Sequence, residues 1–257
     1  MIISNWIGFR ALVRREIVRF FIVASQTLVP PLISSALFIF VFGFSVGRNL
    51  NIQIEGMPYL QFLVPGLIMM HLIESPYTNT SSSLFISRWH NHIQEVLLSP
   101  LSYFEMVLGL LIGGVARGLI VGASVYLISL FFIQFAWHHL LIVLYFYVVV
   151  TIIFSCIGLM VGLWAEGFEK LSLWSTFVIT PLIYFGGVFH SLDMVPGPLR
   201  MVAYLNPILY LVNGLRYGML GVSDVPIELC VTFAGILAVA LFFTVEYLFR
   251  IGYKLRT

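Results

Sequence analysis

The sequence predicts an all-α membrane protein with six transmembrane helices. Three observations favour this fold class: 60% of the 257 residues are hydrophobic, only 9% are charged, and the mean hydropathy is +1.03. A soluble domain carries about 25% charged residues, so this chain could not cover a water-facing surface. Its net charge of +2 is too small to indicate a nucleic-acid partner, and lipid is the expected surrounding.

Six apolar runs are long enough to cross a bilayer. A span needs about 20 mostly apolar residues to cross about 30 Å of hydrocarbon, and within lipid the backbone of such a run must be helical. We expect the spans at residues 28–47, 59–85, 103–133, 139–164, 171–189 and 228–249.

Residues 3–20 differ from these runs because they are amphipathic. On a helical projection, apolar and aromatic residues share one arc, and Glu16 is the single exception inside it. This pattern is typical of a helix that lies in the membrane interface; the alternative is a longer first span with a ragged start. The opposite side of the helix carries Arg10, Arg14, Arg15 and Arg19.

The lysines and arginines predict the orientation. An even number of spans puts both termini on one side, and the side richer in Lys and Arg is usually cytoplasmic. The terminal side would hold Arg10, Arg14, Arg15, Arg19, Arg88, Lys170, Arg250, Lys254 and Arg256. The opposite side would hold only Arg48, Arg200 and Arg216. We therefore expect both termini in the cytoplasm.

Residues 190–225 form an unusual connection between the fifth and sixth spans. They contain several prolines and two apolar stretches, 199–205 and 208–220, each too short to cross the bilayer. We interpret them as two re-entrant helices that dip into the outer half of the membrane. The alternative is a seventh span over 199–220, which would place the basic C-terminus outside, against the charge rule.

Between the second and third spans, the sequence predicts one short amphipathic helix over residues 87–98. Ser99-Pro100 should end this helix, because proline disfavours the helical conformation in the residue before it. Its polar face would either dock into a partner or rest on lipid headgroups, and spacing alone does not separate the two. The apolar face consists of Trp89, Ile93, Val96 and Leu97, and the polar face of Arg88, His92 and Glu95.

Polar residues inside the spans are candidates for function. Arg117 lies within the third span, where an arginine is costly and needs a partner. Counting residues from the helix ends makes Glu74 the expected partner, with His71 one turn away. The three would form a structural ion pair or part of a substrate path; the alternative is the site of an intramembrane enzyme or a channel. Two ligands, His71 and Glu74, are too few for a metal site.

Gly114, Gly118 and Gly122 recur every fourth residue in the third span. Small residues at this spacing let helices approach closely, either within one chain or between two copies.

The chain has no visible ATPase or catalytic motif. A P-loop needs Gly-Lys-Ser/Thr, but the two lysines, Lys170 and Lys254, follow Glu169 and Tyr253. No catalytic residue, bound cofactor or metal ligand is therefore expected in this chain. If ATP drives this protein, another chain hydrolyses it.

Several short stretches carry a family resemblance. They include Phe-Leu-Val-Pro-Gly at 62–66, Glu-Val-Leu-Leu-Ser-Pro at 95–100, Leu-Asn-Pro at 205–207 and Gly-Leu-Arg-Tyr-Gly at 214–218. Together with the order of the elements, they resemble the permease subunit of ABC-2 type ATP-driven exporters over essentially the whole chain. Capsule, O-antigen and nodulation-factor export permeases are more distantly similar.

The resemblance implies a single transmembrane domain over 1–257, in the bacterial inner membrane. It implies a homodimer with two cytoplasmic ATPase subunits, which bind ATP and Mg and drive export of a polysaccharide, lipid or drug-like substrate. Residues 3–20 would be the interface helix. The coupling helix would contact the ATPase through Arg88, Trp89, His92, Ile93, Glu95 and Val96. The extracytoplasmic exit would include Asn206, Pro207, Arg216 and Tyr217.

Overall fold

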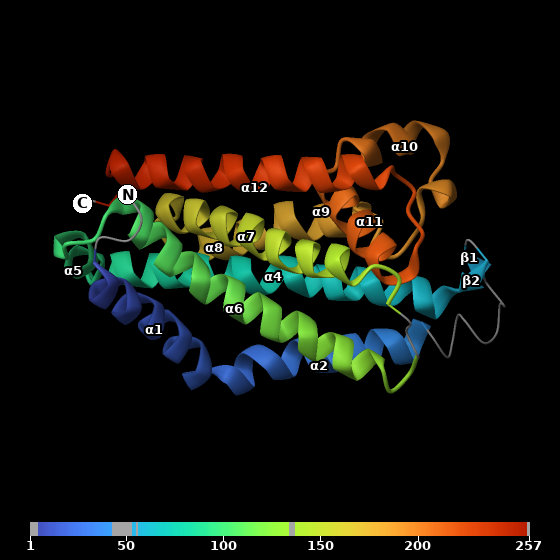
Figure 1. The fold of residues 1–257 in the computed structure, drawn as a ribbon, viewed down its shortest axis with the longest axis horizontal. Helices are drawn as coiled ribbons and strands as arrows, with labels where there is room; N and C mark the ends of the chain where they lie inside the picture. Colours follow the sequence, from blue (N-terminus) through green and yellow to red (C-terminus); the bar gives the residue numbers. More distant parts are fainter. Residues whose placement is uncertain (1–4, 43–52, 55, 134–136, 256–257) are drawn as a thin grey trace.

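The computed structural model describes residues 5–42, 53–54, 56–133 and 137–255. Within these ranges the fold is helical apart from one short hairpin, so the all-α prediction is confirmed. Four long helices run along the bundle (Figure 1): α4 (Tyr59–Trp89), α6 (Tyr103–Ser129), α7 (Leu140–Trp164) and α12 (Ile227–Arg250). Helix α4 packs most extensively against α7 and α6, and its residues are buried along most of its length.

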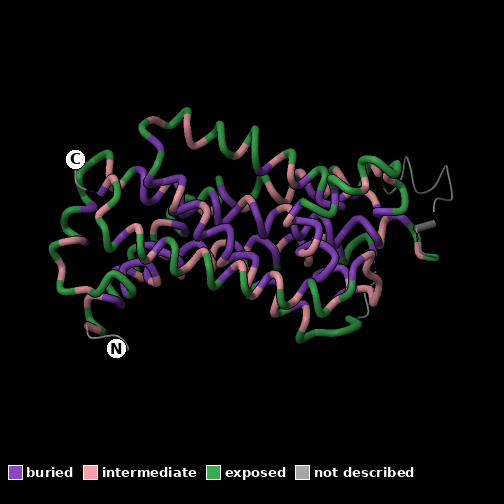
Figure 2. Tube along the Cα trace, turned by 90° about the horizontal axis from the view of Figure 1, so that it is seen from above, coloured by how far each residue is buried: buried purple, intermediate pink, exposed green. Residues whose placement is uncertain are grey.

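The two ends of the bundle differ. Figure 1 shows both chain termini at one end, together with α5 (Ile93–Leu98); we call it the terminal end. The opposite end, here the far end, holds the hairpin and the helices α10 and α11. These are β1 (Gln53–Ile54), β2 (Met57–Pro58), α10 (Gly197–Tyr204) and α11 (Pro207–Leu220). Buried residues follow the middle of the bundle and exposed ones its outside (Figure 2).

A sharp bend separates the first two helices. Helix α1 (Trp6–Ile22) and helix α2 (Ala24–Phe40) meet at Val23 at an angle of 60°. The first predicted span, 28–47, ends outside the described residues. A bend of this size separates an amphipathic segment from an apolar one, as expected of an interface helix followed by a span.

Three of the described helices, α6, α7 and α12, are each long and apolar enough to cross a membrane, and α1 with α2 would make a fourth if read as one broken span. Helix α4 has 31 residues but also a polar run from Glu74 to Ser83 that lowers its hydropathy. The fifth predicted span is a helical run with a π-helical middle: α8 (Phe168–Trp174), η2 (Ser175–Ile179) and α9 (Thr180–Phe185). The count of six spans therefore stays a prediction.

The glycine stripe of α6 faces the inside of the same chain. A Cβ at Gly114 would meet Ser155 and Thr80, and a Cβ at Gly118 would meet Thr151, all within 2.6 Å. A Cβ at Gly122 would clash with Leu72 in the same way. The stripe therefore lets α6 approach α4 and α7, which decides between the internal and the dimer contact.

The connection after α9 contains two helices and not one span. After the 3-10 turn η3 (Leu192–Met194), α10 ends at Tyr204 and α11 begins at Pro207. The Asn206 side chain accepts a hydrogen bond from the Ile208 amide at 3.0 Å, and proline fits the first turn of the next helix. The alternative of a seventh span over 199–220 is therefore wrong, and the depth of the pair in the membrane stays a prediction.

Candidate functional site

The segment 87–98 is not one helix, which corrects the prediction. Residues 87–89 form the last turn of α4, Asn91 has a positive φ of 60°, and α5 starts at Ile93. Because a left-handed residue breaks an α-helix, the faces of the two halves are not continuous. Trp89 is 60% exposed and contacts the rings of Phe85 and Phe168.

Helix α5 rests on the bundle by its apolar side and exposes its polar side. Ile93 and Val96 are buried in a cluster with Leu12 of α1 and Met106 of α6. The opposite side presents His92, Gln94, Glu95 and Leu98 to solvent. Leu98 is 86% exposed, which is unusual for a leucine at a polar end of the molecule. A groove of about 250 Å³ separates α5 from α1.

Arg88 does not belong to this exposed surface, which is a second correction. Its Nη1 donates to the carbonyl oxygens of Gly162, Leu163 and Ala165 at 2.8, 2.7 and 3.2 Å. Its Nε donates to the Lys254 carbonyl at 2.8 Å. The last carbonyls of a helix have no partner within it, so Arg88 caps α7 and ties it to the C-terminal segment.

A second set of contacts lies next to Arg88, between the segment after α7 and the C-terminal segment. Glu166 accepts hydrogen bonds from Lys254 at 2.9 Å and from Lys170. These two ammonium groups lower the pKa of the Glu166 carboxyl to about 2. Because the carboxylate is exposed, its pairing adds little stability, and Arg88 is the main connection between α4, α7 and the C-terminal segment.

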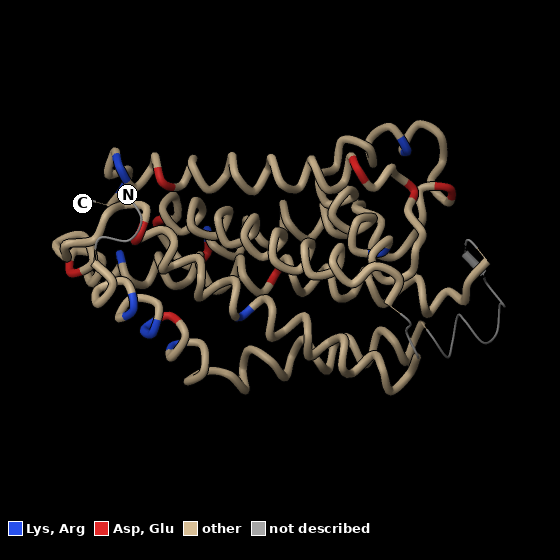
Figure 3. The backbone as a smooth tube through the Cα atoms, viewed as in Figure 1, with Lys and Arg blue, Asp and Glu red and all other residues tan. Residues whose placement is uncertain are grey.

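Helix α1 packs against the bundle through Phe9, Leu12 and Phe20, which are buried. Arg10 and Arg14 are exposed, as the amphipathic pattern predicts. Figure 3 shows the basic residues following one side of α1.

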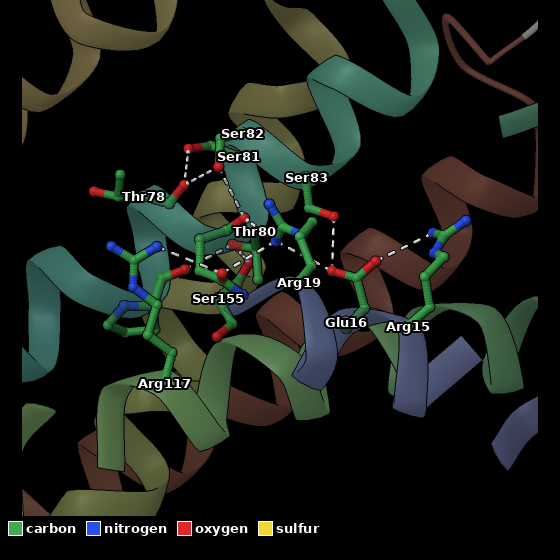
Figure 4. Close-up of polar contacts among 12 residues, drawn as sticks. Arg15, Glu16, Arg19, Thr78, Thr80, Ser81, Ser82, Ser83, Arg117 and Ser155 are labelled. Atoms are coloured by element: carbon green, nitrogen blue, oxygen red, sulfur yellow. Dashed lines mark hydrogen bonds and ion pairs between the residues drawn. The ribbon is translucent and has the colours of Figure 1, made fainter. Parts of the chain in front are cut away.

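Glu16 is buried among apolar residues of α1 because its carboxylate is hydrogen-bonded and paired with arginines. It is 1% exposed, and its carboxylate accepts a hydrogen bond from Ser83 of α4 at 2.7 Å. Arg15 and Arg19 pair with it at 3.1 and 3.2 Å (Figure 4). A buried charge is tolerated when it is paired and hydrogen-bonded, so Glu16 fixes α1 on α4.

The structure does not join Glu74 to Arg117, so the predicted pair is wrong. Arg117 Nη1 donates instead to Oδ1 of Asn79 at 3.5 Å. His71 shares a hydrogen bond of 2.8 Å with Ser35 of α2. Within the described part of the chain, the Glu74 side chain has no hydrogen-bond or ion-pair partner. The three side chains therefore do not form one hydrogen-bonded group.

Glu74 belongs to a polar stripe on α4 instead. Glu74, Thr78 and Ser82 follow each other at four-residue spacing, and each is at least partly exposed. The two hydroxyls donate to carbonyls of the previous turn, Thr78 to Glu74 at 2.7 Å and Ser82 to Thr78 at 2.6 Å. Glu74 is the midpoint of α4, so a partly exposed carboxyl group lies far from both ends of the bundle.

Aromatic rings form a separate cluster toward the far end of the bundle. Phe189 contacts Phe38, Phe42 and Tyr184 at centroid distances of 5.6, 6.4 and 5.3 Å. Tyr59 donates to the Phe189 carbonyl at 3.0 Å. The cluster joins α2, α4 and the turn after α9.

The predicted exit residues are packing anchors at the far end. Asn206 donates to the Leu182 carbonyl at 2.7 Å, and Pro207 is the first residue of α11. Tyr217 stacks on His139 at 5.3 Å. Arg216 is 1% exposed and donates to the Gly187 carbonyl at 2.7 Å.

The sequence patterns did not point to several residues that organise the bundle. Asn79 receives hydrogen bonds from two arginines, and Ser83 donates one to the carboxylate of Glu16. Asp224, at 3.9 Å, is the acid beside Arg216. The run of polar residues from Ser75 to Ser83 inside a predicted span was the available signal, because polar groups at such depth need partners.

Known proteins match nearly the whole chain. Residues 7–220 match the family described as ABC-2 type transporter. The chain is 42% identical to the inner membrane transport permease YadH of Escherichia coli (strain K12), over 91% of this chain and 90% of that protein. It is 22% identical to nodulation protein J of Sinorhizobium fredii (strain NBRC 101917 / NGR234), over 93% of this chain and 90% of that protein. With this coverage, the chain belongs to the ABC-2 type transporter family and is a transport permease.

Proposed function

We propose that this chain is the transmembrane subunit of an ATP-driven exporter in the bacterial inner membrane. Two copies form the permease, and two ATPase subunits bind ATP and Mg at the terminal end, which faces the cytoplasm. The cargo leaves at the far end. The observation that carries this proposal is α5: a short helix anchored by two buried side chains, with an exposed polar face, at the end where both termini lie.

The docking surface is narrower than the sequence predicts. Arg88 is occupied within the chain, and Ile93 and Val96 are buried. The residues that remain free to contact an ATPase are His92, Glu95 and Leu98, with Trp89 on the neighbouring turn. An imidazole and a carboxyl group beside one exposed leucine resemble the polar rim and apolar centre of protein interfaces.

Replacing His92 and Glu95 with alanine should weaken ATPase binding by about tenfold and reduce transport per ATP hydrolysed. We expect the loss of both polar contacts together to cost about 1.4 kcal/mol, which is tenfold in affinity. The measurement is the affinity of the ATPase for the permease in nanodiscs, together with ATP turnover with and without cargo.

Asp193→Ala is the matched control, because it removes an exposed acid at the far end. Unchanged affinity and coupling in the His92/Glu95 variant would contradict docking at α5. ATP turnover by the permease alone would contradict the proposed division between the two chains.

The polar stripe of α4 suggests where the cargo passes. A carboxylate is costly against lipid, so the partly exposed carboxyl at the midpoint of α4 favours a hydrated path between two copies. The stripe supplies one carboxyl group and two hydroxyls to such a path.

Glu74→Gln should reduce transport while leaving stability within about 0.5 kcal/mol, since the side chain has no partner to lose among the described residues. Transport in proteoliposomes and the melting temperature measure the two effects. Glu74→Asp, which keeps the charge, is the control and should retain most transport. A large fall in melting temperature with Glu74→Gln would show a structural partner and contradict the path.

A further inference from the structure

Positive charge is in excess where α1 crosses α4 and α6 (Figure 4). Arg15 and Arg19 share Glu16, and Arg19 and Arg117 both donate to Oδ1 of Asn79, at 3.0 and 3.5 Å. Three guanidinium groups and one carboxylate leave two positive charges without a counter-charge in this cluster. Two arginines that share one neutral oxygen repel each other at short range.

The same arginines have unused donors. The Nε atoms of Arg19 and Arg117 are buried and have no hydrogen-bond partner within the described chain. The single hydrogen bond of Arg117 is long, at 3.5 Å. Donors of an ion that are buried without a partner are strongly unfavourable, so the arrangement calls for an anion that the chain does not supply.

The cluster lies on the terminal side of the hydrocarbon layer, a few ångströms inside its edge. The 31 residues of α4 span about 46 Å, whereas the hydrocarbon is about 30 Å thick. If α4 is centred, about 8 Å extends beyond the hydrocarbon at each end. Asn79 is ten residues from Trp89, about 15 Å along the helix, and therefore about 7 Å inside the hydrocarbon edge. Extension of the arginine side chains toward the interface and local thinning of the bilayer bring guanidinium and lipid phosphate together across this distance.

The surface next to the cluster is apolar. Phe21, Ile22 and Val23 follow Arg19 at the bend between α1 and α2, and all three are exposed. Exposed side chains of this kind provide a surface for acyl chains beside the cationic group. A free anion would gain nothing from them.

We propose that Arg19 and Arg117 bind the phosphate group of an anionic lipid at the junction of α1, α4 and α6. Guanidinium groups match phosphate because their planar donors form paired hydrogen bonds with its oxygens. The bound phosphodiester, with one negative charge, offsets half of the excess charge and fixes α1 against the bundle. The site rests on these contacts and is independent of the proposed export function.

Lipid-depleted, full-length protein in detergent tests the site directly. It is titrated in parallel with phosphatidylglycerol, diacylglycerol and inorganic phosphate, while melting temperature and native mass spectra are recorded. Phosphatidylglycerol should raise the melting temperature by several degrees and leave one bound lipid per chain. Equal stabilisation by diacylglycerol would overturn phosphate recognition. Equal stabilisation by inorganic phosphate would overturn the lipid as its source.

Variants assign the binding to the two arginines. Arg117→Gln and Arg19→Gln should each weaken phosphatidylglycerol binding about tenfold, and Arg117→Lys should retain part of it. Arg250→Gln removes an exposed arginine at the same end and should leave binding unchanged. If Arg250→Gln and Arg117→Gln weakened phosphatidylglycerol binding equally, the binding would reflect only general attraction between basic residues and anionic lipid. That result would overturn the site. If a glutamine variant fails to fold, the titration of the unmodified protein still decides.

Discussion

Replacing Arg88 with alanine should lower the free energy of unfolding by about 2–4 kcal/mol. The guanidinium donates to four carbonyl oxygens, three at the end of α7 and one at Lys254. Alanine leaves those carbonyl oxygens without this donor, in a partly buried part of the protein. It also removes the positive charge that stabilises the C-terminal end of a helix dipole.

Thermal unfolding of the purified permease measures this effect, with Arg250→Ala as the matched control. Arg250 is exposed at the same end of the bundle, so its loss should shift the melting temperature very little. The test also separates the two roles considered for Arg88. A variant that melts like the unmodified protein but loses its response to the ATPase would make Arg88 a docking residue and contradict the cap.

The long apolar helices could be predicted from sequence because their causes are local. The spans expected at 103–133, 139–164 and 228–249 correspond to α6, α7 and α12, with ends that differ by at most four residues. Ser102 and Glu105 form the capping box that starts α6, and Pro226 precedes α12. Hydropathy and capping act over a few residues, so one sequence contains them.

The polar pairs could not be predicted in the same way. Counting residues along two spans gives depth but not rotation, and both are needed to match Glu74 with Arg117. Asn79 is five residues from Glu74, so the two point about 140° apart around α4. An arginine that contacts Asn79 therefore faces away from Glu74. Depth alone therefore selected Glu74 as the partner of Arg117, whereas the actual partner is Asn79.

Arg88 shows a different limit. Helical spacing grouped it with His92 and Glu95, on the assumption that one helix continues through 87–98. The left-handed Asn91 ends that continuity, and asparagine is one of the few residues that tolerate this conformation. Even with the break recognised, the carbonyl oxygens that Arg88 caps lie more than 70 residues away in the sequence, and no local pattern points to them.

Arg216→Met should destabilise the permease by about 3–5 kcal/mol, because it leaves a buried acid without its cation. Arg216 is 1% exposed, and its Nη1 lies 3.9 Å from Asp224. The guanidinium also donates to the Gly187 carbonyl and covers the ring of Phe62, 3.7 Å from the centroid. The side chain thus joins α11 to α4 and to the turn after α9.

A double-mutant cycle with Asp224→Asn isolates the charge pair. Asp224 also accepts a hydrogen bond from Ser191 at 2.6 Å, so Asp224→Asn alone keeps the shape of the corner and should cost less than Arg216→Met. The double variant should be more stable than the sum of the single changes by at least about 1 kcal/mol. Simple additivity, measured by thermal or denaturant unfolding, would contradict the pairing.

Arg200→Met is the control at the same end, since Arg200 pairs with Asp193 on an exposed surface. Exposed pairs contribute at most about 1 kcal/mol, so this variant should remain close to the unmodified protein. Arg216→Lys separates the effect of the positive charge from that of the planar guanidinium group. It keeps the charge near Asp224 but loses the planar group that covers Phe62 while reaching Gly187. An intermediate loss of stability with lysine would show that the far end depends on guanidinium geometry as well as on charge, because one side chain there holds three segments together.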